Sequence, residues 1–239
     1  MTRLFAGELI KVRTTRTALG FGLVAVLLTL ASVLVSILAG DPLAADDKRA
    51  ALDFGGTVAF VLLIYGVVGA TGEFRHQTVA PAVLIAPDRF RLVLARIGAY
   101  GVSAGVFAVA MGIVAFGIGV PLLADSSGAT LGSSDYLSVA AGGLISAVLC
   151  ASLGVGIGTL VRNQVAAVVG VFAWLLVLEP LVGLISQDWT KFTVGTATSA
   201  LGTGGNSDTS GLTAALVLAA WVAVLSFAGA LVDRRRDVD

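Results

Sequence analysis

The feature that most constrains this chain is a series of long apolar stretches that contain no Asp, Glu, Lys or Arg, apart from one Glu. Each stretch is 19 to 28 residues long, and a hydrocarbon core of about 30 Å needs about 20 helical residues to cross it. Because lipid offers the backbone no hydrogen-bond partners, we predict transmembrane helices in an all-α, polytopic membrane protein. The six predicted spans are at about 17–40, 54–72, 97–124, 136–161, 163–187 and 209–232.

Composition agrees with this class and excludes others. Hydrophobic residues make up 57% of the chain and charged residues 13%, which is far from the composition of a soluble domain. The formal net charge is zero, so there is no global basic field to attract nucleic acid, and we expect no nucleic-acid partner. One Cys and one His cannot supply the usual zinc or iron–sulfur ligand sets or an intrachain disulfide, and we expect no metal site.

The basic residues predict how the spans are oriented. Twelve of the 15 fall on the side that holds both termini, and basic flanks mark the cytoplasmic side of a membrane protein. We therefore expect both termini to be cytoplasmic. A cleaved signal peptide is the weaker alternative for the first span, because signal h-regions run about 7–15 residues and this stretch is longer.

Two segments outside the spans have a character of their own. Residues 2–16 combine apolar side chains with four basic ones, which predicts an interfacial helix on the inner leaflet; a basic flank without fixed structure is the alternative. The uncharged stretch 192–207 is rich in Thr, Ser and Gly. We interpret it as part of an extracellular loop, 188–208, that is either polar or a shallow element partly buried in protein.

The fourth predicted span carries small residues at every fourth position. Residues four apart share one face of a helix, and small residues there let another backbone approach closely. We predict a packing surface, either within the chain or between chains. Its members are Gly142, Ser146, Cys150, Gly154 and Gly158.

The one ionisable residue within a span is Glu179, which is followed by Pro180. A proline releases the carbonyl four residues before it, here that of Leu176, and this predicts a break in the fifth helix. A carboxyl group in lipid needs a cavity or a partner. One interpretation is a polar site or gate on an export route, and the other is a hinge whose carboxyl bonds a neighbouring helix.

Residues with catalytic potential are scarce. A phosphate-binding P-loop needs Gly before its Lys, whereas Lys11, Lys48 and Lys191 follow Ile, Asp and Thr. The single histidine is His76, and no span holds a pair of carboxylates for acid–base chemistry. We expect no enzymatic activity and no cofactor bound by this chain.

The connection between the second and third spans, 73–95, has the character of a contact surface. It reads EFRHQTVAPAVLIAPDRFRLVLA, in which a short apolar piece between two prolines is followed by mixed charge and an aromatic residue. Apolar residues in such a loop need a partner, the membrane or the chain's own spans to cover them.

On these residues the chain resembles the permease subunit of the type-2 ABC exporter superfamily. That family has in this loop a Glu, an Arg, a Thr, a Pro-x-Arg and a basic residue that enters the third span. In this sequence they fall on Glu73, Arg75, Thr78, Pro87, Arg89 and Arg96, next to Leu84. The chain departs from the pattern at Gln77, where the family often has Gly, and at Arg96, where it often has Lys. A fifth span that ends in Glu-Pro is similar to drug and antibiotic exporters of the family.

The resemblance covers essentially the whole chain and implies a single permease domain, 1–239, in a prokaryotic inner (plasma) membrane. It implies a separate ABC ATP-binding subunit that holds ATP and Mg, a second permease copy in a homodimer, and an amphiphilic substrate such as a drug, antibiotic or lipid. The loop would act as a coupling helix. Its implied contacts are Glu73, Phe74, Arg75, Thr78, Pro87, Arg89 and Arg91. An ion-gradient-driven secondary transporter and a non-transporting scaffold subunit remain the alternatives.

Overall fold

The computed structural model describes residues 2–40, 42–56, 58–75, 89–124, 126–206 and 208–235. The described residues form helices and no strand. In chain order the elements are α1 (Thr2–Thr14), α2 (Arg16–Leu38), α3 (Ala45–Ala51), α4 (Ala59–Arg75), α6 (Arg89–Ala124), α7 (Ser133–Val161), α8 (Gln164–Ala173), the π-helical η1 (Trp174–Leu178), α9 (Glu179–Ile185), α10 (Gln187–Thr190), α11 (Val194–Gly202) and α12 (Gly211–Arg235).

Five helical segments are long and apolar enough to cross a membrane, which confirms a multi-pass, all-helical membrane protein. They are Arg16–Leu38, Phe90–Ala124, Ser133–Val161, Gln164–Ile185 and Gly211–Val232. The remaining predicted span corresponds to α4, whose apolar part, Ala59–Gly72, is shorter. The 17 residues of α4 extend for about 26 Å at about 1.5 Å per residue.

The apolar stretch predicted as a helix from residue 54 becomes helical only at Ala59. Asp53 Oδ1 accepts hydrogen bonds from the backbone N–H groups of Gly55 and Gly56, at 2.9 and 2.7 Å, and so holds a turn. Phe54 in this turn is buried, with 2% of its surface exposed. The start predicted for this helix is therefore wrong, because the stretch enters the protein core as a turn.

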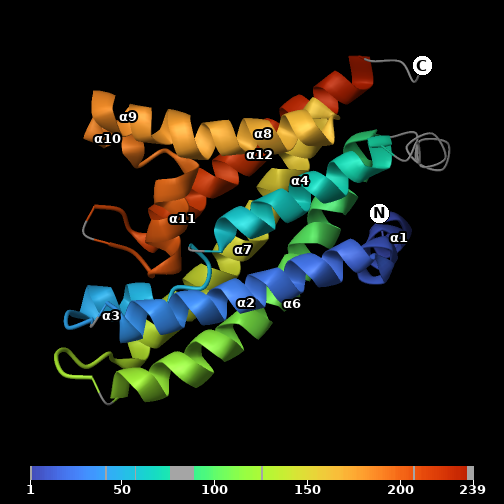
Figure 1. Ribbon diagram of the computed structural model, residues 1–239. Helices are drawn as coiled ribbons and strands as arrows, with labels where there is room; N and C mark the ends of the chain where they lie inside the picture. Colours follow the sequence, from blue (N-terminus) through green and yellow to red (C-terminus); the bar gives the residue numbers. More distant parts are fainter. Residues whose placement is uncertain are drawn as a thin grey trace.

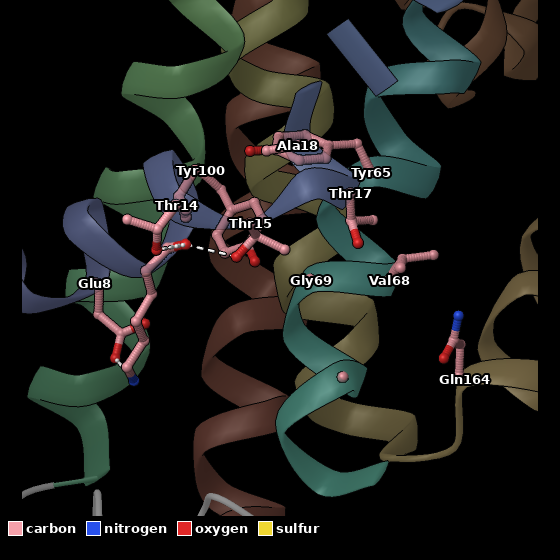
Figure 2. A pocket seen from close by; sticks show the side chains of 13 residues that line it. Glu8, Thr14, Thr15, Thr17, Ala18, Tyr65, Val68, Gly69, Tyr100 and Gln164 are labelled. Carbon is pink, nitrogen blue, oxygen red and sulfur yellow. Dashed lines mark hydrogen bonds and ion pairs between the residues drawn. The ribbon is translucent and has the colours of Figure 1, made fainter. Parts of the chain in front are cut away.

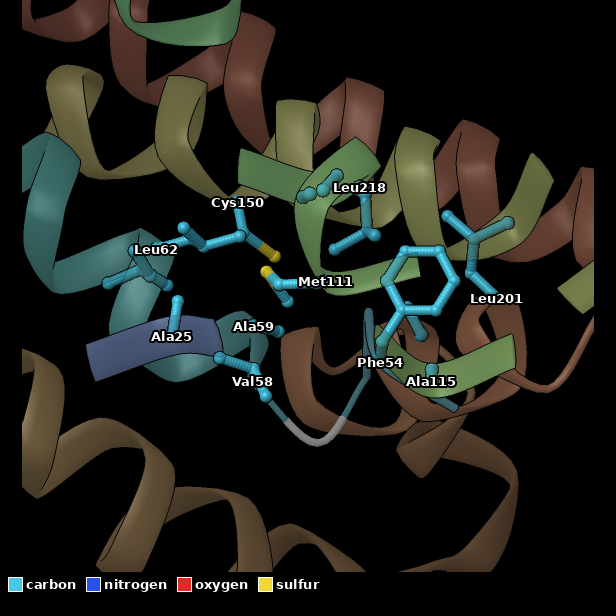
Figure 3. Close-up of a cluster of buried hydrophobic side chains, with 14 of the residues drawn as sticks. Ala25, Phe54, Val58, Ala59, Leu62, Met111, Ala115, Cys150, Leu201 and Leu218 are labelled. Carbon is cyan, nitrogen blue, oxygen red and sulfur yellow. The ribbon is translucent and has the colours of Figure 1, made fainter. Parts of the chain in front are cut away.

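Helix α7 is the centre of the bundle. Within its most apolar window 61% of the residues are buried, against 28% in α2 and 6% in the span formed by α8, η1 and α9. Helices α4, α6, α11 and α12 pack around it (Figure 1). The core contains Leu62 from α4, Met111 from α6, Cys150 from α7 and Leu218 from α12, four of the residues in Figure 3.

The ends of the helices gather at two opposite ends of the bundle. Helix α1 and the Arg235 end of α12 lie at one end, and α3 and α10 lie at the other (Figure 1). Helix α6 begins at Arg89, so residues 89–95 of the predicted loop are helical. The end that holds α1 therefore also holds the end of α4 and the start of α6 (Figure 1).

Two further segments differ in kind from simple surface loops. Of residues 2–16, for which we predicted an interfacial helix, Thr2–Thr14 are helical. This helix packs on α6 and buries Val12. Within 192–207, Val194–Gly202 form α11, which buries Ala197, Ala200 and Leu201 against the rest of the chain. Of the two interpretations of this stretch, the partly buried element is the one observed.

Candidate functional site

The carboxylate of Glu179 joins the fifth apolar span to α11. It accepts hydrogen bonds from the indole Nε1 of Trp174 at 2.9 Å, from the backbone N–H of Val194 at 2.9 Å and from that of Gly195 at 2.9 Å. Val194 and Gly195 are the first two residues of α11, and the hydroxyl of its N-cap residue, Thr193, donates to the carbonyl of Thr190. Glu179 therefore caps α11 from outside the helix, where a negative charge is favourable.

The backbone before Glu179 takes a π-helical form from Trp174 to Leu178. The N–H of Glu179 bonds to the carbonyl of Trp174, five residues back. The helix then continues through Pro180 to Ile185. The α-helix is thus interrupted just before the Glu-Pro pair, but as a π-helical segment within one continuous span and not as a chain break. Such segments are frequent at functional sites.

Two cavities meet at Glu179. One, of about 440 Å³, has several polar residues in its lining, among them Thr193 and Asn206. The other, of about 240 Å³, is more apolar and includes Phe60 and Cys150. Pockets that bind small molecules are typically about 300–1,000 Å³ with a few placed polar groups. The observed geometry is that of a carboxyl bonded to a neighbouring helix, and it also places that carboxyl in the wall of both cavities.

The stripe of small residues on α7 is buried along its whole length. A Cβ atom at Gly154 would lie 2.8 Å from the backbone nitrogen of Val67 in α4. A Cβ atom at Gly158 would lie 2.9 Å from the carbonyl oxygen of Val67. Ser146 donates its hydroxyl to the carbonyl of Gly55 at 3.3 Å. Gly142 faces the end of α11 and Cys150 is fully buried, so the stripe packs within the chain.

The residues implied in coupling are only partly covered by the structure. Glu73, Phe74 and Arg75 form the end of α4 and Arg89 is the first residue of α6, and for these the structure gives the backbone course. Arg91 is exposed in the first turn of α6. Residues outside the described ranges include His76, Gln77, Thr78, Leu84 and Pro87.

Arg96, the last residue of the loop pattern, is buried next to Glu8 of α1. The two residues are 3% and 5% exposed, and Arg96 Nε lies 3.9 Å from Glu8 Oε2. Lys11 Nζ also bonds Glu8 Oε1 at 2.7 Å. Sequence reasoning missed Glu8, although a signal was present: it is the only acidic residue among residues 2–16.

A cavity of about 660 Å³ opens beside Glu8 and Lys11, which form part of its lining (Figure 2). Its lining includes Thr14 at the end of α1, Thr15 between the helices and Thr17 at the start of α2, together with the rings of Tyr65 and Tyr100. The hydroxyl of Tyr65 in α4 and that of Ser103 in α6 share a hydrogen bond of 2.7 Å. The cavity therefore combines hydroxyl groups with aromatic surface at the end of the bundle that holds α1.

Among the described residues, no three His, Cys, Asp or Glu side chains come together as a metal site would require. A scan against models of protein families and a search of curated proteins both found no match for this chain. The fold itself defines a multi-pass α-helical membrane protein. A more specific assignment has to come from the loop pattern and from the geometry of the two sites around Glu8 and Glu179.

Proposed function

We propose that this chain is the membrane-spanning subunit of an ATP-driven exporter of the type-2 ABC kind. The observation that carries the proposal is the pattern of the segment from Glu73 to Arg96. Two features of the structure support it. The described ends of that segment lie at the end of the bundle that holds α1 (Figure 1), and Arg96 is paired with Glu8 of α1 inside the protein.

The proposed topology has six spans, with α4 as the second, and both termini in the cytoplasm of a prokaryotic cell. The turn that precedes Ala59 is buried, so α4 and this turn together can cross where α4 alone is short. Helix α1, which contains Lys11, and the start of α6, which precedes Arg96, lie at the end proposed to be cytoplasmic, and α10, which Lys191 follows, lies at the other (Figure 1). Such a distribution of basic residues is typical of the inner side of a membrane.

In the proposed mechanism a separate ATP-binding subunit contacts the segment through Glu73, Phe74, Arg75, Thr78, Pro87, Arg89 and Arg91. ATP and Mg are held by that subunit, and its closure on ATP displaces the segment. The buried ion pair between α6 and α1 then makes the two helices move together, because separating the two charges would lose their attraction inside the protein. Movement of the bundle releases an amphiphilic substrate outward.

A second copy of the chain completes the proposed transporter. Among the five long apolar spans of the described residues, that of α8, η1 and α9 is the least covered, with 6% of its window buried. Its exposed apolar side chains include Val165, Val169 and Phe172. The uncovered span supplies a surface for a second copy, and the cavities beside Glu179 and Pro180 supply the proposed pathway or gate.

The test is purification of the tagged chain from its host in mild detergent. We expect it to bring down a subunit with a G-x-x-x-x-G-K-[ST] phosphate loop and Mg-dependent, vanadate-sensitive ATP hydrolysis. A variant with Arg75→Glu and Arg89→Glu should lose both the co-purified subunit and its ATP hydrolysis. Lys191→Glu, at the opposite end of the bundle, is the matched control and should keep both.

Three outcomes would contradict the proposal. If the double variant retained the ATPase, the coupling role assigned to this segment would be wrong. Uptake by the purified chain alone, driven by an ion gradient in liposomes, would identify a secondary transporter. Absence of both ATPase and transport would leave a scaffold subunit.

A further inference from the structure

An apolar cavity of about 230 Å³ lies between α8 with η1 on one side and α4, α7 and α12 on the other. Its floor consists of buried side chains, among them Leu63 and Leu153, which are 3% and 1% exposed. Its rim includes Val161, Ala166 and Gly170, which are exposed on the outside of the chain. The cavity therefore opens sideways, between two membrane spans.

The lining gives a polar ligand nothing to bind. The described residues that form it are all apolar or aromatic, and both indole N–H groups among them are already donated. Trp174 Nε1 donates to Glu179 Oε1 at 2.9 Å, and Trp221 Nε1 donates to the carbonyl of Phe192 at 2.9 Å. The two indole rings stand edge to face with their centroids 5.5 Å apart. What the cavity offers is aliphatic and aromatic surface.

Size and position favour one kind of occupant. An apolar cavity of about 150 Å³ is enough to hold benzene, and this one is larger. At Gly170 an added Cβ would meet no described heavy atom within 4 Å, so the rim is open at that point. An empty cavity forfeits dispersion contacts on all its walls, and in the spans that flank this opening the surrounding material is lipid hydrocarbon.

We propose that this cavity is a binding site for one hydrocarbon chain of a bilayer lipid. The rings of Trp174 and Trp221 would contact the chain on one side, and the floor formed by α4 and α7 would contact it on the other. The site rests on the membrane-spanning character of the helices and not on the exporter assignment. Occupation would also brace η1, because Trp174 is at once a wall of the cavity and a hydrogen-bond donor to Glu179.

The chain's three tryptophans make the site testable by fluorescence. Trp189→Phe removes the one that does not line the cavity, so that the remaining tryptophan emission comes from Trp174 and Trp221. The full chain in detergent is then titrated with a fatty acid brominated in mid-chain, a contact quencher of tryptophan. We expect a saturable loss of emission that an excess of the unbrominated fatty acid reverses.

Two glycine variants locate the quencher. Gly170→Phe adds a ring at the open rim of the cavity and should abolish the saturable phase by obstructing the entrance. Gly117→Phe in α6 is the matched control, because this glycine also lies in an apolar span with no described heavy atom within 4 Å of an added Cβ, and it should keep that phase.

Quenching that is linear and not reversed by competitor would overturn the proposal, as would an equal saturable phase in a folded Gly170→Phe variant. If Gly170→Phe does not purify as a single species, the competition experiment on the parent chain decides alone.

Discussion

Replacing Glu179 by Ala removes the acceptor shared by three donors: the indole N–H of Trp174 and the backbone N–H groups of Val194 and Gly195. Hydrogen bonds to a charged group contribute about 1.5–3 kcal/mol each. Part of this is recovered, because the cavity of about 440 Å³ beside the carboxylate gives water access to the freed donors. We take about 1 kcal/mol per donor, and so about 3 kcal/mol in all.

For a chain of this size 1 kcal/mol corresponds to about 2–4 °C in Tm. The Ala variant should therefore unfold about 6–12 °C below the parent. Glu179→Gln keeps one acceptor oxygen but turns an amide NH₂ toward an N–H group of α11. It should cost about 1 kcal/mol, or about 2–4 °C.

The assay is thermal unfolding of the purified chain in detergent, followed by tryptophan emission. Asp188→Ala is the control, because Asp188 lies nearby in α10 with its side chain 91% exposed. An Ala variant that unfolds at the parent temperature, or no lower than the Gln variant, would refute the capping role of Glu179. If Glu179→Gln left transport and its pH dependence unchanged, the proposed pathway role would fail while the capping role stood.

Two further predictions concern packing and the buried ion pair. Gly154→Val forces a side chain against the backbone of Val67 in α4 and should cost about 1–3 kcal/mol of stability, whereas Gly117→Val in open space should change the Tm little; equal effects would contradict the close approach of α4 and α7. Glu8→Gln and Arg96→Met should each cost about 1–3 kcal/mol, because each removes one member of a buried charge pair, and the double variant should cost less than the sum. Additive losses in that cycle would show that the two side chains do not interact.

The positions of the membrane helices could be predicted from the sequence because charge-free length is a local property. Five predicted spans match helices to within a few residues, except that α6 begins earlier, at Arg89. The start of α4 was not predictable in this way, since apolar residues suit a buried turn as well as a helix. The turn is held by the side chain of Asp53, which accepts hydrogen bonds from the backbone N–H groups of Gly55 and Gly56.

The partners in the candidate sites were beyond sequence reasoning because they are long-range. Glu179 was identified from its place in an apolar span, but nothing in the pattern pointed to the N–H groups of residues 194 and 195. Arg96 entered as the last residue of a loop pattern, whereas its contact is with Glu8 in a different helix. The coupling role of residues 73–91 stays a prediction.

The ion pair between α1 and α6 also bears on how the chain is made. Glu8 and Arg96 are 88 residues apart in the sequence, and at about 5–20 residues per second Arg96 is synthesised about 4–18 s after Glu8. During that interval α1 has no partner on α6. Docking of α1 on α6 therefore has to follow synthesis of the start of the third predicted span.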